Sequence, residues 1–386
     1  MQATLVRAEI VPRRTQEARI FGNHRGLPAD NWPPTEYDWA NHRVKKSSCL
    51  MAKHTIVLIP GDGIGPEVSR AARRVLEAAG LSVDWIEMLA GAAAVEAGLE
   101  NVLPERTVAA IRLHKIALKG PVTTPVGKGF KSVNVQLRQK LNLYAAVRPV
   151  RSLPGIKTRY DGVDMVIVRE NTEGLYSGIE NEVVPGVVTS LKVASEVACT
   201  RIARYAFRYA TRRHRQKITV FHKANIMKLS DGLFLNCARK IHEEEYPNIE
   251  YDEVIIDAGC MKLVQDPTKM DVLLMENLYG DLVSDLCAGL VGGLGVVPGS
   301  NIGEEAAVFE AVHGSAPDIA GKGIANPLAI IMSGVMMLNH IHEEALGSKI
   351  KTAYDAVLAE GKSLTRDLGG TATTDQFADA VIAKMK

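Results

Sequence analysis

The sequence predicts an α/β protein, because short apolar runs alternate with helical patterns along most of the chain. The first unit is the clearest example: residues 54–60 are an apolar, β-branched run, glycines interrupt the chain at 61–65, and a helical pattern covers 66–79. Pro66 suits the first turn of that helix, and Gly80 suits its end. No internal repeat or low-complexity tract interrupts the alternation.

The other elements follow from the same apolar periods. Further buried strands are expected at 116–119, 165–168, 217–222, 253–256 and 272–275, and these complete the predicted set. Helices are expected over 193–211, from near 230, over 327–339 and over 377–386.

The first fifty residues differ from the rest of the chain. They combine arginines, acidic residues and paired prolines without a sustained apolar period. A secretory signal would need an apolar segment, and a transit peptide would be poor in acidic residues. We therefore interpret residues 1–50 as a poorly ordered N-terminal extension, with the compact fold beginning at Met51. An extra element packed on the body is the alternative.

Composition excludes several classes of partner. The chain has 46 basic and 44 acidic residues and a net charge of +2, so neither nucleic acid nor an anionic membrane is expected as its main partner. No apolar stretch approaches the roughly 18 residues that a membrane span needs. The five cysteines are widely spaced and form no C-x-x-C pair, which fits a reducing compartment. We expect a bacterial-type cytoplasm, with the mitochondrial matrix as the alternative.

Three aspartates form the first candidate site. Asp281 and Asp285 are four residues apart, which places both carboxylates on one face of a helix, and Asp257 follows the strand at 253–256. The sequence shows little basic charge near the pair, so their repulsion would call for a cation. Three carboxylates without histidine or cysteine suit Mg²⁺ or Mn²⁺. The alternative, which spacing alone favours, is that Asp281 caps a helix and Asp285 faces water.

Basic residues form the second candidate site. Arg138, Arg148 and Arg169 each lie near the end of an apolar element and suit bidentate binding of carboxylates, although each alone also fits a surface ion pair. Lys223 follows the strand at 217–222, at the strand end where α/β proteins keep their sites. A solvated loop lysine is the alternative for Lys223.

The glycine loop at 61–65 suggests dinucleotide binding only weakly. A Rossmann fingerprint would place its third glycine at position 66, where this chain has Pro66. The glycines also suit a tight turn between strand and helix. We therefore place no pyrophosphate at this loop.

Six stretches, taken together, resemble the isocitrate and 3-isopropylmalate dehydrogenase family of β-decarboxylating dehydrogenases. They are IPGDGIGPEV (59–68), TTPVGKGFKSVNVQLRQ (123–139), VRENTEGLYSG (168–178), HKANIMKLSDGLF (222–234), NLYGDLVSDLCAGLVGGLG (277–295) and EAVHGSAPDIAGKGIANP (310–327). The resemblance implies that family's α/β fold, which is not a Rossmann fold. It also implies a large cofactor-binding domain from residues 51–143 and 292–386, and a smaller domain with the dimer interface from 144–291.

Within the family, the resemblance is strongest to the NAD-dependent isocitrate branch. Ser132 and Asn134 stand where isocitrate dehydrogenases contact the γ-carboxylate of the substrate, a pair that isopropylmalate and homoisocitrate enzymes lack. Asp318 and Ile319 match NAD-using members, whereas NADP-using bacterial relatives carry lysine and tyrosine. A carboxylate accepts hydrogen bonds from ribose hydroxyls and repels a 2′-phosphate, by about 4 kcal/mol per charge pair at about 4 Å.

The resemblance implies a role for each matched residue. The substrate carboxylates would contact Ser132, Asn134, Arg138, Arg148 and Arg169. The cation, Mg²⁺ or Mn²⁺, would be held by Asp281, Asp285 and the Asp257 of a second subunit. The same second subunit would supply Lys223 to assist deprotonation of the hydroxyl, and Tyr176 would protonate the enol. NAD would contact Thr124, His313, Gly314, Asp318, Ile319 and Asn326.

The implied reaction is the NAD-dependent oxidative decarboxylation of isocitrate to 2-oxoglutarate by a homodimer or larger homo-oligomer. One alternative is a related substrate, namely 3-isopropylmalate, homoisocitrate or tartrate, against which Ser132 and Asn134 weigh. Another is a non-catalytic regulatory subunit of a hetero-oligomer, which would have lost some acid, base or metal residues that are all present here. Ser132 also resembles a serine that is phosphorylated in some bacterial relatives, where a phosphate would repel the substrate.

Overall fold

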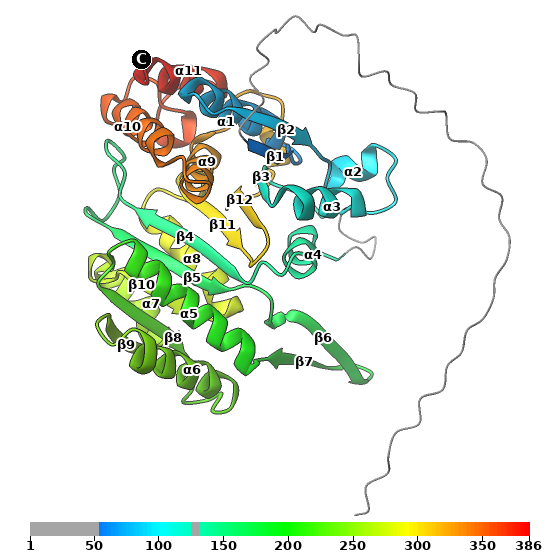
Figure 1. The fold of residues 1–386 in the computed structure, drawn as a ribbon, viewed down its shortest axis with the longest axis vertical. Helices are drawn as coiled ribbons and strands as arrows, with labels where there is room; N and C mark the ends of the chain where they lie inside the picture. Colours follow the sequence, from blue (N-terminus) through cyan, green and yellow to red (C-terminus); the bar gives the residue numbers. More distant parts are fainter. Residues whose placement is uncertain (1–53, 125–130) are drawn as a thin grey trace, which may run out of the picture. The chain divides into compact units, whose positions relative to one another are not determined.

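The computed structural model describes residues 54–124 and 131–386 and shows an α/β protein (Figure 1). The predictions for residues 1–50 and for a domain start at Met51 lie outside the described residues. The strands are β1 (His54–Ile59), β2 (Val83–Glu87), β3 (Ile116–Lys119), β4 (Ala145–Arg151), β5 (Asp164–Glu170), β6 (Gly174–Val184), β7 (Val187–Val193), β8 (Lys217–His222), β9 (Glu250–Ile255), β10 (Val272–Met275), β11 (Pro298–Ile302) and β12 (Ala307–Ala311). The helices are α1 (Gly65–Ala79), α2 (Ala92–Glu96), α3 (Glu105–His114), α4 (Val133–Lys140), α5 (Glu196–Arg212), α6 (Ser230–Glu245), α7 (Ile256–Gln265), α8 (Asn277–Leu290), α9 (Leu328–His340), α10 (Glu344–Glu360) and α11 (Thr374–Lys384).

One mixed sheet organises the described chain. Its ten strands run in the order β2-β1-β3-β12-β11-β4-β5-β10-β8-β9. Pairing is parallel from β2 to β12 and again from β5 to β9, whereas β11 and β4 in the middle are antiparallel to their neighbours. This order differs from the all-parallel Rossmann sheet, as expected. The domain boundaries stay predictions, because one sheet runs through both parts.

The six predicted strands correspond to β1, β3, β5, β8, β9 and β10. The prediction that these complete the set was wrong, because β2, β4, β6, β7, β11 and β12 are strands too. The missed strands lack a continuous apolar run: β4 contains Arg148, Pro149 and Arg151, and most of β6 and β7 is exposed. The helix expected from residue 193 begins at Glu196, because the Ser195 side chain accepts from the Ala198 N–H and caps it.

Helices cover both faces of the sheet. In Figure 1, α5 and α6 lie over one face of the β5–β9 half, and α7 and α8 lie over the other. On the β1–β12 half, α9 packs against β11 and β12 and is buried over most of its length. The continuous apolar runs of the central strands follow from this double cover, since neither face meets water. The helix α8 packs against β5 and also contacts β4, which positions the side chains described below.

The glycine loop before α1 is a tight structural turn, as the sequence predicted. Gly61 and Gly63 have φ angles of 87° and 59°, and a Cβ atom on Gly61 would lie 2.1 Å from the Pro121 carbonyl oxygen. The Asp62 carboxylate between them accepts hydrogen bonds from the N–H groups of Ala92, Ala93 and Thr123. The loop thereby fastens the start of α1 to the chain that follows β3.

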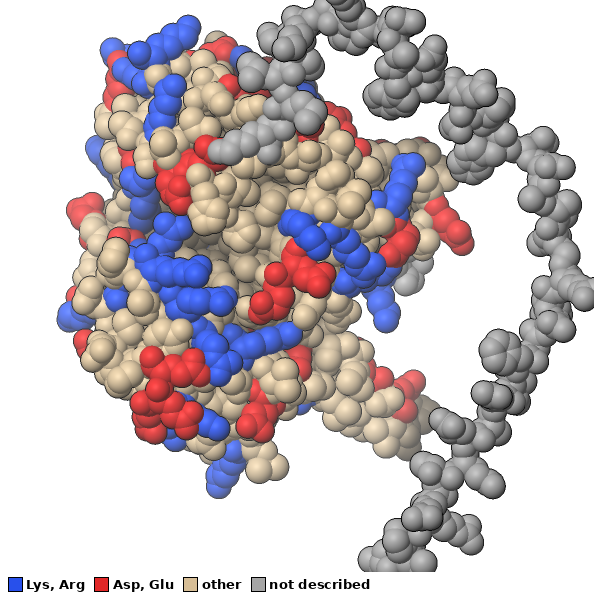
Figure 2. All heavy atoms as spheres, viewed as in Figure 1, with Lys and Arg blue, Asp and Glu red and all other residues tan. Residues whose placement is uncertain are grey.

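No helix in the described part of the chain is long and apolar enough to cross a membrane. On the face that Figure 2 shows, lysine and arginine side chains are interleaved with aspartate and glutamate.

Candidate active site

A cavity of about 250 Å³ opens at the carboxyl ends of β3 and β12, beside the antiparallel strands β11 and β4. In open α/β sheets, sites form where the strand arrangement changes in this way. The structure brings nine of the predicted site residues to its wall. They are Ser132, Asn134, Arg138, Arg148, Tyr176, Asp281, Asp285, His313 and Gly314.

The two predicted metal ligands lie on one face of α8, as their spacing indicated. Asp281 does not cap the helix, because Glu276 occupies the N-cap and accepts from the Tyr279 and Leu278 N–H groups. The Tyr176 hydroxyl donates to Asp281 Oδ2 over 2.5 Å. Both carboxylates line the cavity.

The expectation of little basic charge near these carboxylates was wrong. Arg148 Nη1 lies 3.2 Å from Asp285 Oδ1, and its Nη2 lies 3.6 Å from Asp281 Oδ1. Arg169 Nη1 donates to Asp281 Oδ1. The arginines are more than a hundred residues away in sequence, but α8 crosses the strands β4 and β5 that carry them. Only the packing of α8 reveals this proximity.

Arg169 is the one predicted substrate ligand that does not line the cavity. Its side chain is fully buried, and its Nε and Nη2 donate to Asn277 Oδ1 over 3.1 and 2.7 Å. Its guanidinium carbon also lies 5.0 Å from the Tyr176 ring centroid. In this structure Arg169 therefore contacts Asp281 and Tyr176 from the protein interior and not from the cavity.

Burial and charge act on the two carboxylates differently. Burial alone would raise the pKa of Asp281, but Arg169, Tyr176 and Arg148 together hold it below its ordinary value. Burial raises the pKa of Asp285 above its ordinary value; Arg148 and Arg169 oppose this shift, while the charge of Asp281 adds to it. A pair of hard oxygen donors with residual repulsion suits a divalent cation.

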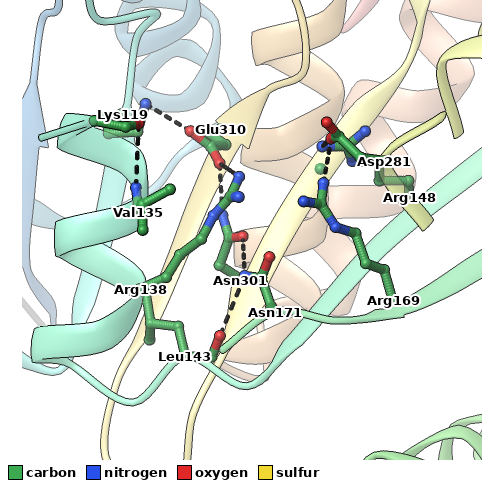
Figure 3. Close-up of polar contacts among 12 residues, drawn as sticks. Lys119, Val135, Arg138, Leu143, Arg148, Arg169, Asn171, Asp281, Asn301 and Glu310 are labelled. Atoms are coloured by element: carbon green, nitrogen blue, oxygen red, sulfur yellow. Dashed lines mark hydrogen bonds and ion pairs between the residues drawn. The ribbon is translucent and has the colours of Figure 1, made fainter. Parts of the chain in front are cut away.

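The sequence did not single out a second charged network on the opposite wall, formed by Lys119, Arg138, Asn301 and Glu310. Figure 3 shows Arg138 and Asn301 directed toward Glu310. Glu310 Oε2 lies 2.5 Å from Lys119 Nζ, and its Oε1 lies 3.5 Å from Arg138 Nη2 and accepts from Asn301 Nδ2. Burial would raise the pKa of Glu310, but Lys119 and Arg138 lower it to about 2. A lysine ending the apolar run of β3 was the available sequence signal.

Several polar atoms at this site are buried without a hydrogen-bond partner. They include Asn134 Oδ1, Arg138 Nε and His313 Nε2. Unsatisfied buried polar atoms are uncommon and call for an explanation such as an absent ligand or water. Three of them, on residues of one cavity, mark this wall as a binding surface.

A second cavity, of about 720 Å³, adjoins the first through His313 and Gly314, which line both. Ile319 and Asn326 also line it, so it collects four of the six residues predicted to contact NAD. Asp318 is exposed on the short turn Pro317–Ile319 and is not in its wall. Thr124 lines neither cavity, and its Oγ1 accepts from the Val133 N–H at the start of α4 over 3.0 Å.

Lys223 and Asp257 lie outside both cavities. They pair with one another, Lys223 Nζ to Asp257 Oδ1 over 2.5 Å, and the Asp257 side chain is 69% exposed. Lys223 lowers the pKa of Asp257 by donating to it. Within residues 54–124 and 131–386 no three acidic, histidine or cysteine side chains are close enough to hold a metal ion together. Within one chain, Asp281 and Asp285 therefore line the first cavity, whereas the third predicted metal ligand, Asp257, lies outside it.

Comparison with known proteins identifies relatives of this chain. Residues 55–381 match the family described as isocitrate/isopropylmalate dehydrogenase. The catalytic subunit 5 of a mitochondrial NAD isocitrate dehydrogenase from Arabidopsis thaliana is 52% identical over 85% of this chain and 87% of its own length. A mitochondrial NAD isocitrate dehydrogenase regulatory subunit from Dictyostelium discoideum is 50% identical over 88% of this chain and 94% of its own.

A crystal structure shows the same fold. The isocitrate dehydrogenase from Methylococcus capsulatus is 51% identical and has a TM-score of 0.83, over 86% of this chain and 99% of that one. The family match and these relatives confirm the resemblance that six sequence stretches indicated, and the structural match confirms the expected fold.

Proposed function

Because the chain belongs to the isocitrate/isopropylmalate dehydrogenase family, we propose that it oxidises and decarboxylates isocitrate to 2-oxoglutarate with NAD and Mg²⁺ or Mn²⁺. The observation that carries this proposal is the first cavity. There, Arg138 and Arg148, which suit carboxylates, share one cavity wall with two aspartates that suit a cation, and the hydroxyl of Tyr176 in the same wall donates to Asp281. A 2-hydroxy tricarboxylate presents the complementary groups.

In this proposal the substrate lies between α4 and α8. Arg138 and Arg148 bind its carboxylates, and Ser132 and Asn134 at the start of α4 bind the distal γ-carboxylate. The unpartnered Arg138 Nε and Asn134 Oδ1 would meet the substrate directly or through water. Arg169 holds Asp281 and Tyr176 in place and reaches the substrate only when its contact with Asp281 opens.

The residues present fit a divalent cation, provided that a second chain completes the ligand set. Asp281 and Asp285 supply two hard oxygen donors, and Asp257 of a second subunit supplies the third. When bound, the cation makes the substrate hydroxyl more acidic and stabilises negative charge on the same oxygen during decarboxylation. Lys223 of the second chain assists removal of the hydroxyl proton, and Tyr176 returns a proton to carbon.

The proposed dimer is supported by exposed apolar side chains on the part of the chain that carries Lys223 and Asp257. The ribbon β6–β7 projects beyond the helices in Figure 1 and exposes Val183, Val184, Val187 and Val188. Apolar side chains on the helices, including Met261 of α7 and Leu282 of α8, are exposed as well. Patches of this kind typically mark interfaces between chains. We propose residues 144–291 as the smaller domain that forms this interface, and 51–143 with 292–386 as the larger one.

The second cavity is the proposed NAD site. In a dinucleotide bound there, the nicotinamide end would face the first cavity, which shares His313 and Gly314 with the second, and the adenosine end would lie at His313, Ile319 and Asn326. We propose that the exposed Asp318 accepts hydrogen bonds from the adenosine ribose at the rim, and that Thr124 lies near the nicotinamide end.

Two alternatives have specific support. The family also contains isopropylmalate dehydrogenases, and the Dictyostelium discoideum relative is named a regulatory subunit. Against the first stands the Ser132 and Asn134 pair in the cavity wall. Against the second stands the presence of Tyr176, Lys223 and all three aspartates.

For the compartment, we propose a reducing one, the cytoplasm of a bacterial-type cell. The cysteines Cys199, Cys237, Cys260 and Cys287 are free. The names of the Arabidopsis thaliana and Dictyostelium discoideum relatives favour the mitochondrial matrix as the alternative. Localisation of the tagged full-length chain decides between them.

The deciding experiment is the initial rate of NADH formation at 340 nm by the purified chain, with each combination of substrate, NAD or NADP, and Mg²⁺ or chelator. We expect turnover with isocitrate, NAD and Mg²⁺, its loss in chelator, and its loss in Asp285→Asn. Asp379→Asn, an exposed aspartate paired with Arg74, is the matched control and stays active. Turnover of isopropylmalate would show that isopropylmalate, and not isocitrate, is the substrate. Inactivity in every combination would favour the alternative of a regulatory subunit.

A further inference from the structure

The main chain of Lys223 is held by one buried side chain. Lys223 follows β8, and its backbone N–H donates to Asp231 Oδ2 over 2.6 Å. Its carbonyl oxygen accepts from the N–H groups of Ile226 and Met227, so both of its backbone polar groups are fixed. Of these contacts, only the one to Asp231 reaches beyond the turn itself, into the first turn of α6.

Within one chain, the turn that carries Lys223 packs few apolar side chains against the core, of which Ala224 is one. Ile226 is 69% exposed and Leu229 is 90% exposed. A segment with few buried apolar contacts depends on its polar contacts for a defined position. The hydrogen bond from Lys223 to Asp231 therefore links this turn to a buried side chain. Met227 adds further links, since its carbonyl oxygen accepts from the Asp231 N–H over 3.1 Å and its sulfur lies 4.0 Å from Lys192 Nζ.

The Asp231 side chain is itself held in place by burial and by an ion pair. It is 2% exposed, and Lys192 Nζ of β7 lies 2.5 Å from its Oδ1. The same Lys192 Nζ lies 4.6 Å from the Tyr279 ring centroid of α8 and 3.8 Å from Glu276 Oε1. A buried carboxylate that is paired with an ammonium group makes a strong, directional acceptor for a backbone N–H.

Asp231 and Lys192 line neither of the two cavities that form the proposed site. Neither side chain thus contacts substrate or cofactor directly. Their effect on catalysis must pass through the groups they hold, and the catalytic group in direct contact with Asp231 is Lys223.

We propose that Asp231 is a positioning residue for Lys223 and acts on the active site of the partner subunit, to which Lys223 belongs. This inference rests on the proposed shared active site. In Asp231→Asn the amide oxygen can still accept one hydrogen bond, but the charge that holds Lys192 is lost. We expect kcat to fall about 10- to 100-fold, as for a displacement near 1 Å, with KM for isocitrate changed less than about threefold.

Mixed dimers test whether the effect acts across the interface. Chains carrying Tyr176→Phe and Asp231→Asn, each with a different affinity tag, are co-expressed and the mixed dimer is isolated through both tags. In the mixed dimer, one site combines the intact Tyr176 of the Asp231→Asn chain with the intact Lys223 of the Tyr176→Phe chain. We expect about half of the wild-type kcat, although both parent homodimers are impaired.

A mixed dimer as slow as the Asp231→Asn homodimer would overturn the inference, since Asp231 would then act within its own chain or on folding alone. Lys223→Met mixed with Tyr176→Phe is the positive control for the shared site. If this control pair also fails to recover activity, the shared site is wrong and the inference falls with it. If the control pair recovers and only the Asp231→Asn pair fails, the proposed function stands and the inference alone is refuted.

Two further variants separate positioning from folding. Lys192→Arg keeps the cation beside Asp231 and is expected to retain kcat within about threefold, whereas Lys192→Met should lower kcat like Asp231→Asn and recover in the same mixed dimer. Equal activity of the two Lys192 variants would contradict the inference. Asp375→Asn, a paired aspartate in the first turn of α11, is the matched control and should leave kcat unchanged.

Discussion

Replacing Glu310 by glutamine should destabilise the fold through the charges that it leaves behind. Glu310 is the partner of Lys119, whose side chain is 2% exposed, and of Arg138, whose side chain is 11% exposed. The pKa of Glu310 falls from its ordinary 4.5 to about 2, and at about 1.4 kcal/mol per pH unit this corresponds to about 3 kcal/mol. Breaking a buried ion pair from one side typically costs about 3–5 kcal/mol, which agrees.

The assay is urea unfolding followed by tryptophan fluorescence, comparing Glu310→Gln with the wild type at pH 7 and pH 4. Because the folded-state pKa lies below the unfolded-state value, the contribution of Glu310 is fully present above pH 4.5 and is lost as the pH falls toward 2. The difference in unfolding free energy should therefore be about 3 kcal/mol at pH 7 and about 1 kcal/mol smaller at pH 4.

The matched control is Glu360→Gln. The pKa of Glu360 is also lowered to about 2, by Lys384 and Lys362, but this carboxylate is fully exposed. Water and salt screen such pairs, so its replacement should not change the unfolding midpoint measurably. The reasoning is refuted if Glu310→Gln costs less than about 1 kcal/mol at pH 7, or if its cost does not shrink at lower pH.

Two predictions concern specificity. In Asp318→Lys combined with Ile319→Tyr, the ratio of kcat/KM for NADP to that for NAD should rise at least about tenfold, because a cation replaces the carboxylate near the 2′-phosphate. A tenfold change needs only about 1.4 kcal/mol. An unchanged ratio would show that position 318 does not contact the ribose. Ser132→Asp keeps an N-cap for α4, so the melting temperature should stay unchanged while kcat/KM for isocitrate falls about 100-fold or more through charge repulsion. Ser132→Asn, a neutral cap of equal size, should lose less, and equal losses would rule out the electrostatic explanation.

The sequence predicts strands that are continuous apolar runs, and it misses β11 and β12, which are fully buried but contain polar residues such as Asn301 and Glu310. Residues 272–275 and 165–168 are continuous apolar runs, because helices cover both sides of β10 and β5. The β6–β7 ribbon lacks this signal, since its side chains are mostly exposed in one chain.

For the candidate site, the sequence predicts which charged residues take part but not which of them lie side by side. The spacing of Asp281 and Asp285 correctly indicates one helix face, because four residues is nearly one turn. That Arg148 and Arg169 neutralise them depends on α8 packing over β4 and β5, which no local pattern encodes. Lys119 ends β3, and Glu310 lies one residue before the end of β12. These strands are far apart in sequence and adjacent in the sheet, so the pairing of the two residues follows only from the strand order.

The glycine loop contributes to the candidate site mainly through its contacts with other segments, although its Ile64 lines the second cavity directly. Gly61 lies against the carbonyl oxygen of Pro121, and Gly63 lies so close to Ser315 that a Cβ atom would come within 2.0 Å of its carbonyl oxygen. Ile64 N–H donates to that same oxygen, and Thr123 and Ser315 hydrogen-bond through their hydroxyls over 2.6 Å. The loop thus joins the segment that follows β3, which lines the first cavity, to the segment that follows β12, which lines both cavities. Pro66 is compatible with this structural role and incompatible with a Rossmann pyrophosphate turn. The presence of Pro66, which weakened the nucleotide interpretation of the loop, therefore agrees with the structural interpretation.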